Sequence, residues 1–216
     1  IFQFDTEFFP MKKVFLSLVF TAVFLASFGQ QKFQVSSPNG QVQVTLSNQE
    51  RLTYSISYLE NVLFQPSALG FSLNRPEMDL TEFEVLGSEE KEVNQSWTPI
   101  YGERSKIKDH YRELRLRLQT KTQPKVQVNL VFKVYDDGVG FRYEFPEQEG
   151  IKHFIVGDEL TEFKMGADHT AFWIPGDYDT NKFLYKTTRL SEVKALAANA
   201  EEIDIAVKSP IGDNFV

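Results

Sequence analysis

Alternation of apolar and polar residues with a period of two dominates the sequence after residue 30. The clearest example is the run 126–134, in which every second residue is Val, Leu or Phe. Successive side chains of a strand point to opposite faces, so this spacing predicts a strand with one buried face. Helical periodicity is nearly absent, and the one candidate helix is at about Ser191 to Asn199. The pattern therefore constrains the chain to an all-β fold.

Turn residues separate the alternating runs. Asp136-Asp137-Gly138 follows the run just described, and Phe141, Tyr143 and Phe145 then alternate with polar residues. This arrangement predicts a hairpin whose two apolar faces lie on the same side. Shorter alternating runs occupy 42–46, 54–58, 114–118 and 203–207. Several short strands divided by turn signals predict an antiparallel β-sandwich with little helix.

The N-terminal region has the features of a targeting signal. Lys12 and Lys13 follow Met11 and precede an apolar run from Val14 to Phe28. Such a run is short for a permanent bilayer span and is typical of a secretory signal peptide, although a membrane anchor stays the alternative. We therefore expect 1–10 to be translated upstream residues, 11–29 to be the signal peptide and 30–216 to be the domain. The expected location is periplasmic or extracellular, with no permanent membrane span after signal removal.

Charge and cysteine content restrict the partners. The net charge is −7, and the sequence has no cluster of Lys or Arg, so nucleic acid is not expected to bind. The chain has no cysteine, which excludes disulfides and Cys-ligated metal sites. Neutral ligands suit this composition better than phosphate-bearing ones.

The common catalytic motifs are missing. The three histidines lie in no HxH or HExxH spacing, and there is neither a G-x-S-x-G elbow nor a glycine-rich phosphate loop. Carboxylates remain as catalytic groups, but 30 acidic residues do not identify a pair that could act on a sugar. The residues therefore assign no catalytic residue and leave any metal ligand unknown.

One segment, Ala171 to Tyr185 (AFWIPGDYDTNKFLY), concentrates aromatic and acidic residues. Aromatic rings stack on the C–H faces of sugars, and carboxylates accept hydroxyl protons, so this segment suits a carbohydrate rim or an interdomain contact. The candidate residues are Trp173, Asp177, Tyr178 and Asp179. In the alternative interpretation, Phe172 and Trp173 are core residues and the acids form a turn around Gly176.

Four stretches together carry a resemblance to a known family: TYSISY followed by PSALGFSL, then YGERSKIKDHYREL, VYDDGVGFRYEFP and FWIPGDYDTNKFLYKTTRLSE. In this order they resemble the N-terminal domain of glycoside hydrolase family 97, over nearly all of residues 33–216. The resemblance implies a β-supersandwich of the galactose-mutarotase-like type that packs against a (β/α)8 barrel. It also implies that the catalytic carboxylates and most ligands of an active-site calcium belong to that barrel, which is missing here.

The resemblance implies a function as well. We expect a non-catalytic domain, incomplete at its C-terminal end, of an exported, calcium-dependent exo-α-glycosidase acting on α-glucosides or α-galactosides. The domain would support and rim the active site of the barrel, and the chain alone would be inactive. Two alternatives stay open from the residues: a stand-alone carbohydrate-binding module, and a purely structural sandwich. The charged stretch Tyr101 to Tyr111 is expected to be a solvated loop.

Overall fold

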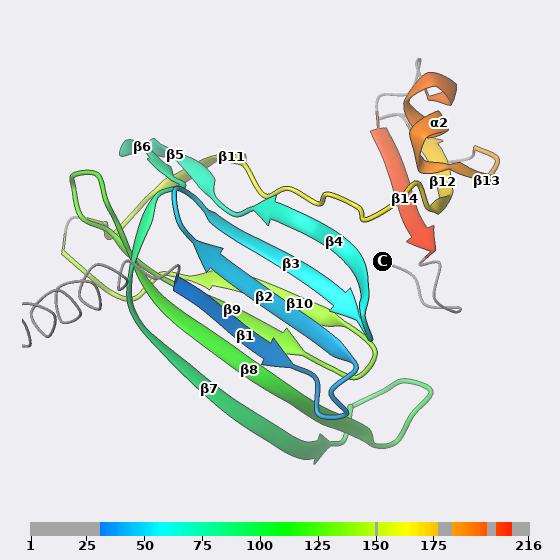
Figure 1. The fold of residues 1–216 in the computed structure, drawn as a ribbon, viewed down its shortest axis with the longest axis horizontal. Helices are drawn as coiled ribbons and strands as arrows, with labels where there is room; N and C mark the ends of the chain where they lie inside the picture. Colours follow the sequence, from blue (N-terminus) through cyan, green and yellow to red (C-terminus); the bar gives the residue numbers. More distant parts are fainter. Residues whose placement is uncertain (1–30, 150, 177–182, 198–201, 209–216) are drawn as a thin grey trace, which may run out of the picture. The chain divides into compact units, whose positions relative to one another are not determined.

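The computed structural model describes residues 31–149, 151–176 and 183–197, together with the backbone of 202–208. The chain divides into two units, Ile1–Gln31 and Lys32–Val216, and nearly all described residues belong to the second. These residues form four sheets and one short helix (Figure 1). Every pairing with a determined register is antiparallel, which confirms the predicted all-β class.

Two four-stranded sheets make the sandwich (Figure 1). The first contains, in spatial order, β1 (Gln31–Ser36), β2 (Val42–Asn48), β3 (Leu52–Tyr58) and β4 (Asn61–Ala68). The second contains β10 (Val139–Glu144), β9 (Gln127–Val134), β8 (Ile107–Thr120) and β7 (Phe83–Trp97). Sequence neighbours are therefore spatial neighbours in both sheets, as expected of hairpin-connected strands.

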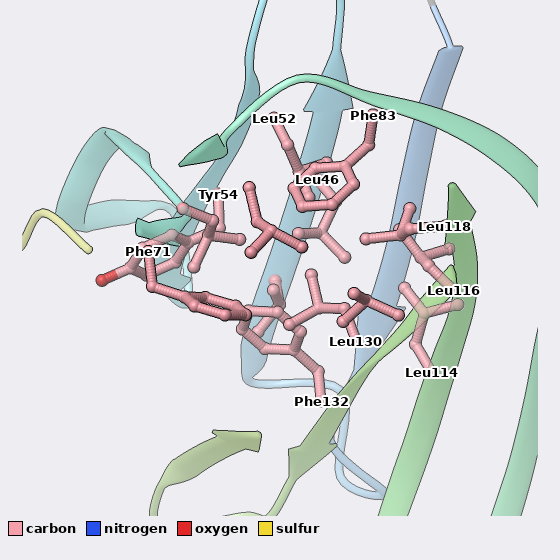
Figure 2. Packing of buried hydrophobic residues seen from close by; sticks show 14 of the residues in the cluster. Leu46, Leu52, Tyr54, Phe71, Phe83, Leu114, Leu116, Leu118, Leu130 and Phe132 are labelled. Carbon is pink, nitrogen blue, oxygen red and sulfur yellow. The ribbon is translucent and has the colours of Figure 1, made fainter. Parts of the chain in front are cut away.

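The core lies between these two sheets. Leu46 and Tyr54 of the first sheet and Leu116 and Phe132 of the second are at most 1% exposed, and they belong to one cluster. Figure 2 shows their side chains pointing toward one another across the interior, with Phe71 and Phe83 packed beside them. The apolar sides of the alternating runs thus meet and leave water, which is the main favourable contribution to folding.

The predicted hairpin after residue 126 is confirmed. Strand β9 pairs with β10 in the register Val134↔Val139, and the Tyr135 amide donates to the Gly138 carbonyl across the turn at 2.8 Å. The Phe132 and Phe141 rings, which face each other in this register, are stacked with centroids 5.1 Å apart. The hairpin therefore brings both apolar faces to the core side.

A third sheet has the order β11 (Ile155–Glu159), β5 (Phe71–Arg75) and β6 (Glu77–Leu80). Its residues Phe71, Leu73 and Leu80 belong to the sandwich core. Gly70, which precedes β5, has φ of +152°, and a Cβ there would stand 2.7 Å from the Leu80 carbonyl oxygen. The chain can turn from β4 into β5 at this point because glycine carries no Cβ.

The stretch after β11 continues along β4. The Glu162 carboxylate accepts the Ala68 amide at 2.9 Å, and the Glu162 carbonyl accepts the Tyr54 hydroxyl at 2.9 Å. The Gly166 amide donates to the Leu63 carbonyl at 2.8 Å. A Cβ at Gly166 would lie only 2.2 Å from the Val62 carbonyl oxygen, so this close approach of two backbones requires glycine.

The expectation of a solvated loop over Tyr101 to Tyr111 is wrong for its second half. Strand β8 begins at Ile107, and β7 pairs with it as far as Trp97↔Ile107. This part of the hairpin is missed because most of its β7 side chains are exposed and most of its β8 side chains are only partly buried, so burial imposes no clear alternation of apolar and polar residues.

Two expectations about the N-terminal region concern residues that lie outside the described ones. The predicted signal peptide, 11–29, and the residues 1–10 before it both lie there, so these assignments stay predictions. Within the described ranges, the structure contains no helix with the length and apolar character needed to cross a membrane.

Candidate contact surface of the aromatic segment

The aromatic segment begins in the central strand of the fourth sheet. This sheet has the order β13 (Lys186–Arg189), β12 (Thr170–Gly176) and β14 (Glu202–Lys208), and helix α2 (Leu190–Leu196) follows β13 directly (Figure 1). In β12, Trp173 is opposite Lys186 on one side and Ile205 on the other. The predicted strand at 203–207 and the predicted helix near Ser191 are both confirmed.

Trp173 is a core residue of this small unit. Its exposure is 1%, and it packs with Ala171 of the same strand and with Val193 and Ala197 of the helix region. The indole Nε1 donates to Thr188 Oγ1 at 3.1 Å, so the one polar atom of the ring has a partner. The indole thus joins the strand to the helix.

A cation lies over the same ring. The Lys186 ammonium is 4.8 Å from the centroid of the Trp173 indole and donates to the Leu196 carbonyl at 3.4 Å. A cation over an indole face is attracted by the negative face of the ring. Lys186 therefore connects the end of α2 to the strand that carries the indole.

The start of α2 is held by one carboxylate outside the helix and one within its first turn. Its N-cap is Arg189, whose side chain has no acceptor. The Asp168 carboxylate instead accepts both the amide and the hydroxyl of Ser191 at 2.9 Å, and these bonds lower the pKa of Asp168. The Glu192 carboxylate accepts the Arg189 amide at 2.8 Å. Two carboxylates thus satisfy the donors that a helix start leaves unpaired.

Large apolar side chains are exposed on the C-terminal side of this segment. Leu184 and Tyr185 are 85% and 83% exposed, and Phe183 is 37% exposed. Phe172, on the face of β12 opposite Trp173, is 36% exposed. Consecutive exposed apolar residues are uncommon on a surface that only faces water, so this stretch is a candidate contact surface.

The predicted site residues therefore divide into two groups. Asp177, Tyr178 and Asp179 lie in 177–182, outside the described residues, and they stay predictions. Trp173 is described and is buried, so a sugar could stack on its ring only after the unit opens. The alternative interpretation of Trp173 as a core residue fits this position, although its core is the small one beside α2 rather than the sandwich core. Phe172 is not a core residue, because it faces the other side of the strand.

The described residues do not fit a metal site. None of them forms a group of three or more His, Asp or Glu side chains that could hold an ion. Calcium takes about six to eight oxygen ligands, so no calcium position can be assigned within these ranges. The buried carboxylate of Glu113 is paired with Lys91 at 3.1 Å and with Arg115 at 3.7 Å, which marks it as part of an ion-pair network on the sheet.

Comparison with known proteins gives consistent matches to one family of enzymes. The family described as Glycosyl-hydrolase 97 N-terminal matches residues 35–211. The retaining alpha-galactosidase of Bacteroides thetaiotaomicron is 27% identical over 195 residues, which cover 85% of this chain and 28% of that protein. The chain thus spans well under half the length of this relative.

Solved structures agree with this match. A family 97 glycoside hydrolase from Pseudoalteromonas sp. strain K8, in complex with acarbose, superposes with a TM-score of 0.72 at 29% identity, covering 82% of this chain and 27% of that one. A variant of that enzyme in complex with panose gives a TM-score of 0.71 at 28% identity, with the same coverage. A beta-arabinopyranosidase shares the fold, with a TM-score of 0.65 at 22% identity over 72% of this chain and 26% of that one.

The family match covers most of the sequence, and the superposed structures have the same sandwich of antiparallel sheets that the alternating runs predict. The resemblance seen in the four sequence stretches is thereby confirmed. This chain belongs to glycoside hydrolase family 97 and comprises its N-terminal domain.

Proposed function

We propose that this chain is the non-catalytic N-terminal domain of an exported, calcium-dependent exo-α-glycosidase that acts on α-glucosides or α-galactosides. The domain supports the (β/α)8 barrel that completes the enzyme, and its aromatic segment contributes to the rim of the active site. The observation that carries this proposal is the coverage of the relatives. The chain matches about a quarter of an alpha-galactosidase and of an enzyme solved with acarbose and panose.

The substrate class follows from these relatives. One is named a retaining alpha-galactosidase, and the other was solved with the oligosaccharides acarbose and panose. The acidic, cysteine-free composition of this chain favours a neutral ligand over a phosphate-bearing one. We therefore propose an α-glucoside or α-galactoside as the carbohydrate partner of the complete enzyme.

The exposed stretch Phe183 to Tyr185 supports the rim role. It presents two residues more than 80% exposed beside the acidic 177–179 sequence, and it is held at its base by the Trp173 core. Aromatic side chains on a rigid base are suited to sugar C–H faces or to a second domain. A stand-alone binding module is less favoured, because its strongest sugar platform, the Trp173 indole, is buried.

Export is proposed from the apolar run after Met11 and the small residues Ser27 and Gly29 before Gln30. If the gene is expressed in a bacterial host, mature protein should be recovered outside the cytoplasm with Gln30 as its first residue. Intact-mass measurement of the recovered protein checks this. A cytoplasmic protein that retains residues 11–29 would contradict the proposal.

Calcium dependence is proposed for the complete enzyme and not for this chain. When bound, the ion would orient and polarise the sugar in the barrel. We expect the 216-residue chain to hydrolyse aryl α-glucoside and α-galactoside no faster than buffer, and its thermal unfolding to be unchanged by EDTA or millimolar calcium. The longer protein that includes the barrel should turn over one of these substrates and lose that activity in EDTA.

Outcomes of this assay separate the alternatives. Turnover by the 216-residue chain would exclude the supporting role, and a calcium-dependent rise in its unfolding temperature would place an ion site within it. Calorimetric titration with maltooligosaccharides and galactosides tests the module: micromolar binding by the chain alone would favour it over a supporting domain.

A further inference from the structure

Strands β7 and β8 extend well beyond the sandwich as a two-stranded ribbon. β9 leaves β8 at the pair Arg112↔Val134, whereas β7 continues along β8 to Trp97↔Ile107. Figure 1 shows the two strands running alongside each other to the loop that joins them. Five residue pairs, at about 3.4 Å per residue, give a ribbon about 17 Å long. A two-stranded ribbon is only marginally stable in water without further support.

The polarity of the two faces inverts along β8. Within the sandwich, the face with Leu114 and Leu116 is buried, and the opposite face carries charged residues such as Arg117. In the ribbon, the continuation of the inner face carries Arg112, His110 and Lys108. The apolar side chains of the ribbon lie on its outer face, where Val93 is opposite Tyr111 and Trp97 is opposite Ile107.

This outer face leads to an exposed tip. Trp97 is 50% exposed, Ile100 is 100% exposed and Tyr101 is 89% exposed. Below them, Tyr111 is only 5% exposed, because the Tyr135 ring lies with its centroid 5.0 Å away and the Lys133 ammonium lies 4.3 Å from the ring centroid. The ribbon is thus braced at its base by the sheet and carries uncovered apolar groups only at its far end. We name Trp97, Ile100 and Tyr101 the ribbon tip.

Single exposed apolar residues need no explanation, but three at the end of a projecting ribbon do. The residues around the tip carry both signs of charge, with Glu103 and Asp109 among Arg104, Lys106 and Lys108. Apolar and aromatic residues surrounded by a mixed polar rim are the usual composition of a protein interface. The tip is therefore suited to contact with another protein surface rather than with nucleic acid.

The area of the tip decides between possible occupants. A fully exposed aromatic side chain can bury about 150–250 Å², so Tyr101, the half-exposed Trp97 and the smaller Ile100 together supply roughly 400 Å². A stable complex between separate molecules needs about 800 Å² per partner. A contact within one chain needs less, because the covalent connection supplies a high effective concentration. The relatives contain such a partner, since the matched part is only 27–28% of their chains.

We propose that the ribbon tip, with the outer face of the ribbon below it, docks against the catalytic segment that completes the enzyme. This inference rests on the proposed function and adds to it a second contact, separate from the aromatic segment around Trp173. Docking covers the tip and stabilises the far end of a ribbon that the sheet supports only at its base.

Hydrogen exchange tests the contact directly. The amides of residues 98–106 are measured in the 216-residue chain and in the longer protein that includes the catalytic segment. We expect exchange at least tenfold slower in the longer protein. The double substitution Ile100→Ser with Tyr101→Ser should remove this protection and lower the unfolding temperature of the longer protein, while leaving that of the chain alone unchanged. Val62→Ser with Leu86→Ser, at positions 54% and 44% exposed on β4 and on the sandwich part of β7, is the matched control.

The possible results are distinguishable. Equal exchange in both proteins, with the longer one active on an aryl α-glycoside, overturns the docking proposal and leaves the proposed function intact. A longer protein without glycosidase activity contradicts the proposed function instead. Protection that appears in the 216-residue chain and rises with its concentration overturns the proposal in favour of a contact between two copies.

Discussion

Raising the pH from 10 to 12 is expected to lower the free energy of unfolding by about 4 kcal/mol through the buried Tyr54 and the partly buried Tyr143. Burial, followed by the nearby Tyr143, raises the pKa of Tyr54 to about 12. Burial likewise raises the pKa of Tyr143 to about 12. An unfolded tyrosine has a pKa of about 10. Below pH 10 both states are protonated, and between 10 and 12 only the unfolded state ionises, so stability falls as pH rises.

The size of the effect follows from the two shifts. Each tyrosine lowers the free energy of unfolding by at most about 1.4 kcal/mol per pH unit in this window, which amounts to about 2 kcal/mol per residue between pH 10 and pH 12. Domains of this kind are stable by about 5–15 kcal/mol, so the loss is a large fraction of the total. Urea titrations at several pH values from 8 to 12 measure it.

Two variants attribute the effect to the buried rings. Tyr143→Phe should reduce the slope of stability against pH by at most about 1.4 kcal/mol per unit, because it removes the ionisable hydroxyl. Tyr54→Phe should reduce the slope similarly but cost about 1 kcal/mol at pH 8, since its hydroxyl donates to the Glu162 carbonyl. Tyr101→Phe changes an 89% exposed ring and serves as the control. Equal slopes in all four proteins would contradict the assignment.

The sequence predicts those strands that are buried on one face. Strand β9 is predicted because every second side chain, from Val128 to Val134, faces the core, and that constraint leaves a period of two. Even in this strand the burial of one residue is not predicted: Val131 is 1% exposed although it faces outward. It is flanked by Arg115 of β8 and Arg142 of β10, and such cross-strand neighbours are fixed by register and not by local sequence.

Strand β7 shows the opposite case. Of its 15 residues only Phe83 is buried, so neither face needs to be apolar and the alternation is weak. Its free edge is lined instead with charged residues such as Glu89, Glu90 and Lys91, which is how natural sheets discourage pairing with other chains. The ribbon tip is missed for the same reason. Only the pairing of β7 with β8 shows that Trp97 and Ile100 lie at one end.

The candidate site was predicted as a segment but not residue by residue. Aromatic enrichment in 171–185 is compatible both with packing and with ligand contact, because the same rings serve either role. Strand alternation places Trp173 and its neighbour Phe172 on opposite faces of β12. The sequence does not show which of the two faces is the inner one, because that depends on where α2 packs. The helix itself is predictable, because 191–197 (SEVKALA) lacks strand periodicity and contains good helix formers such as Glu, Lys, Ala and Leu.

The substitution Trp173→Ala should remove about 3–5 kcal/mol from the stability of the small unit, because it deletes the largest side chain of its core. That core has few other members, Ala171, Val193 and Ala197 with Leu190 beside them, so the cavity has little to fill it. We expect the amides of β12 and α2 to exchange at least a hundredfold faster, which corresponds to about 3 kcal/mol. Hydrogen exchange followed by mass spectrometry measures this.

Amides of β9 report whether the loss is local. They should keep their protection, because the Trp173 cluster and the sandwich cluster are separate. Equal acceleration in β9 would show that the two clusters unfold together. Trp173→Phe should recover most of the stability, losing mainly the hydrogen bond to Thr188, and Phe172→Ala should cost less because that ring is 36% exposed.

The same variants test the function of the segment in the complete enzyme. The Trp173 core holds the base of the stretch that ends in Leu184 and Tyr185, so unfolding of the unit would release the proposed rim. We expect Trp173→Ala to raise KM for the α-glycoside with little change in barrel stability, and Trp173→Phe to restore it. If KM is unchanged while β12 exchanges rapidly, the segment is a structural support only, and the rim role of Asp177, Tyr178 and Asp179 falls with it.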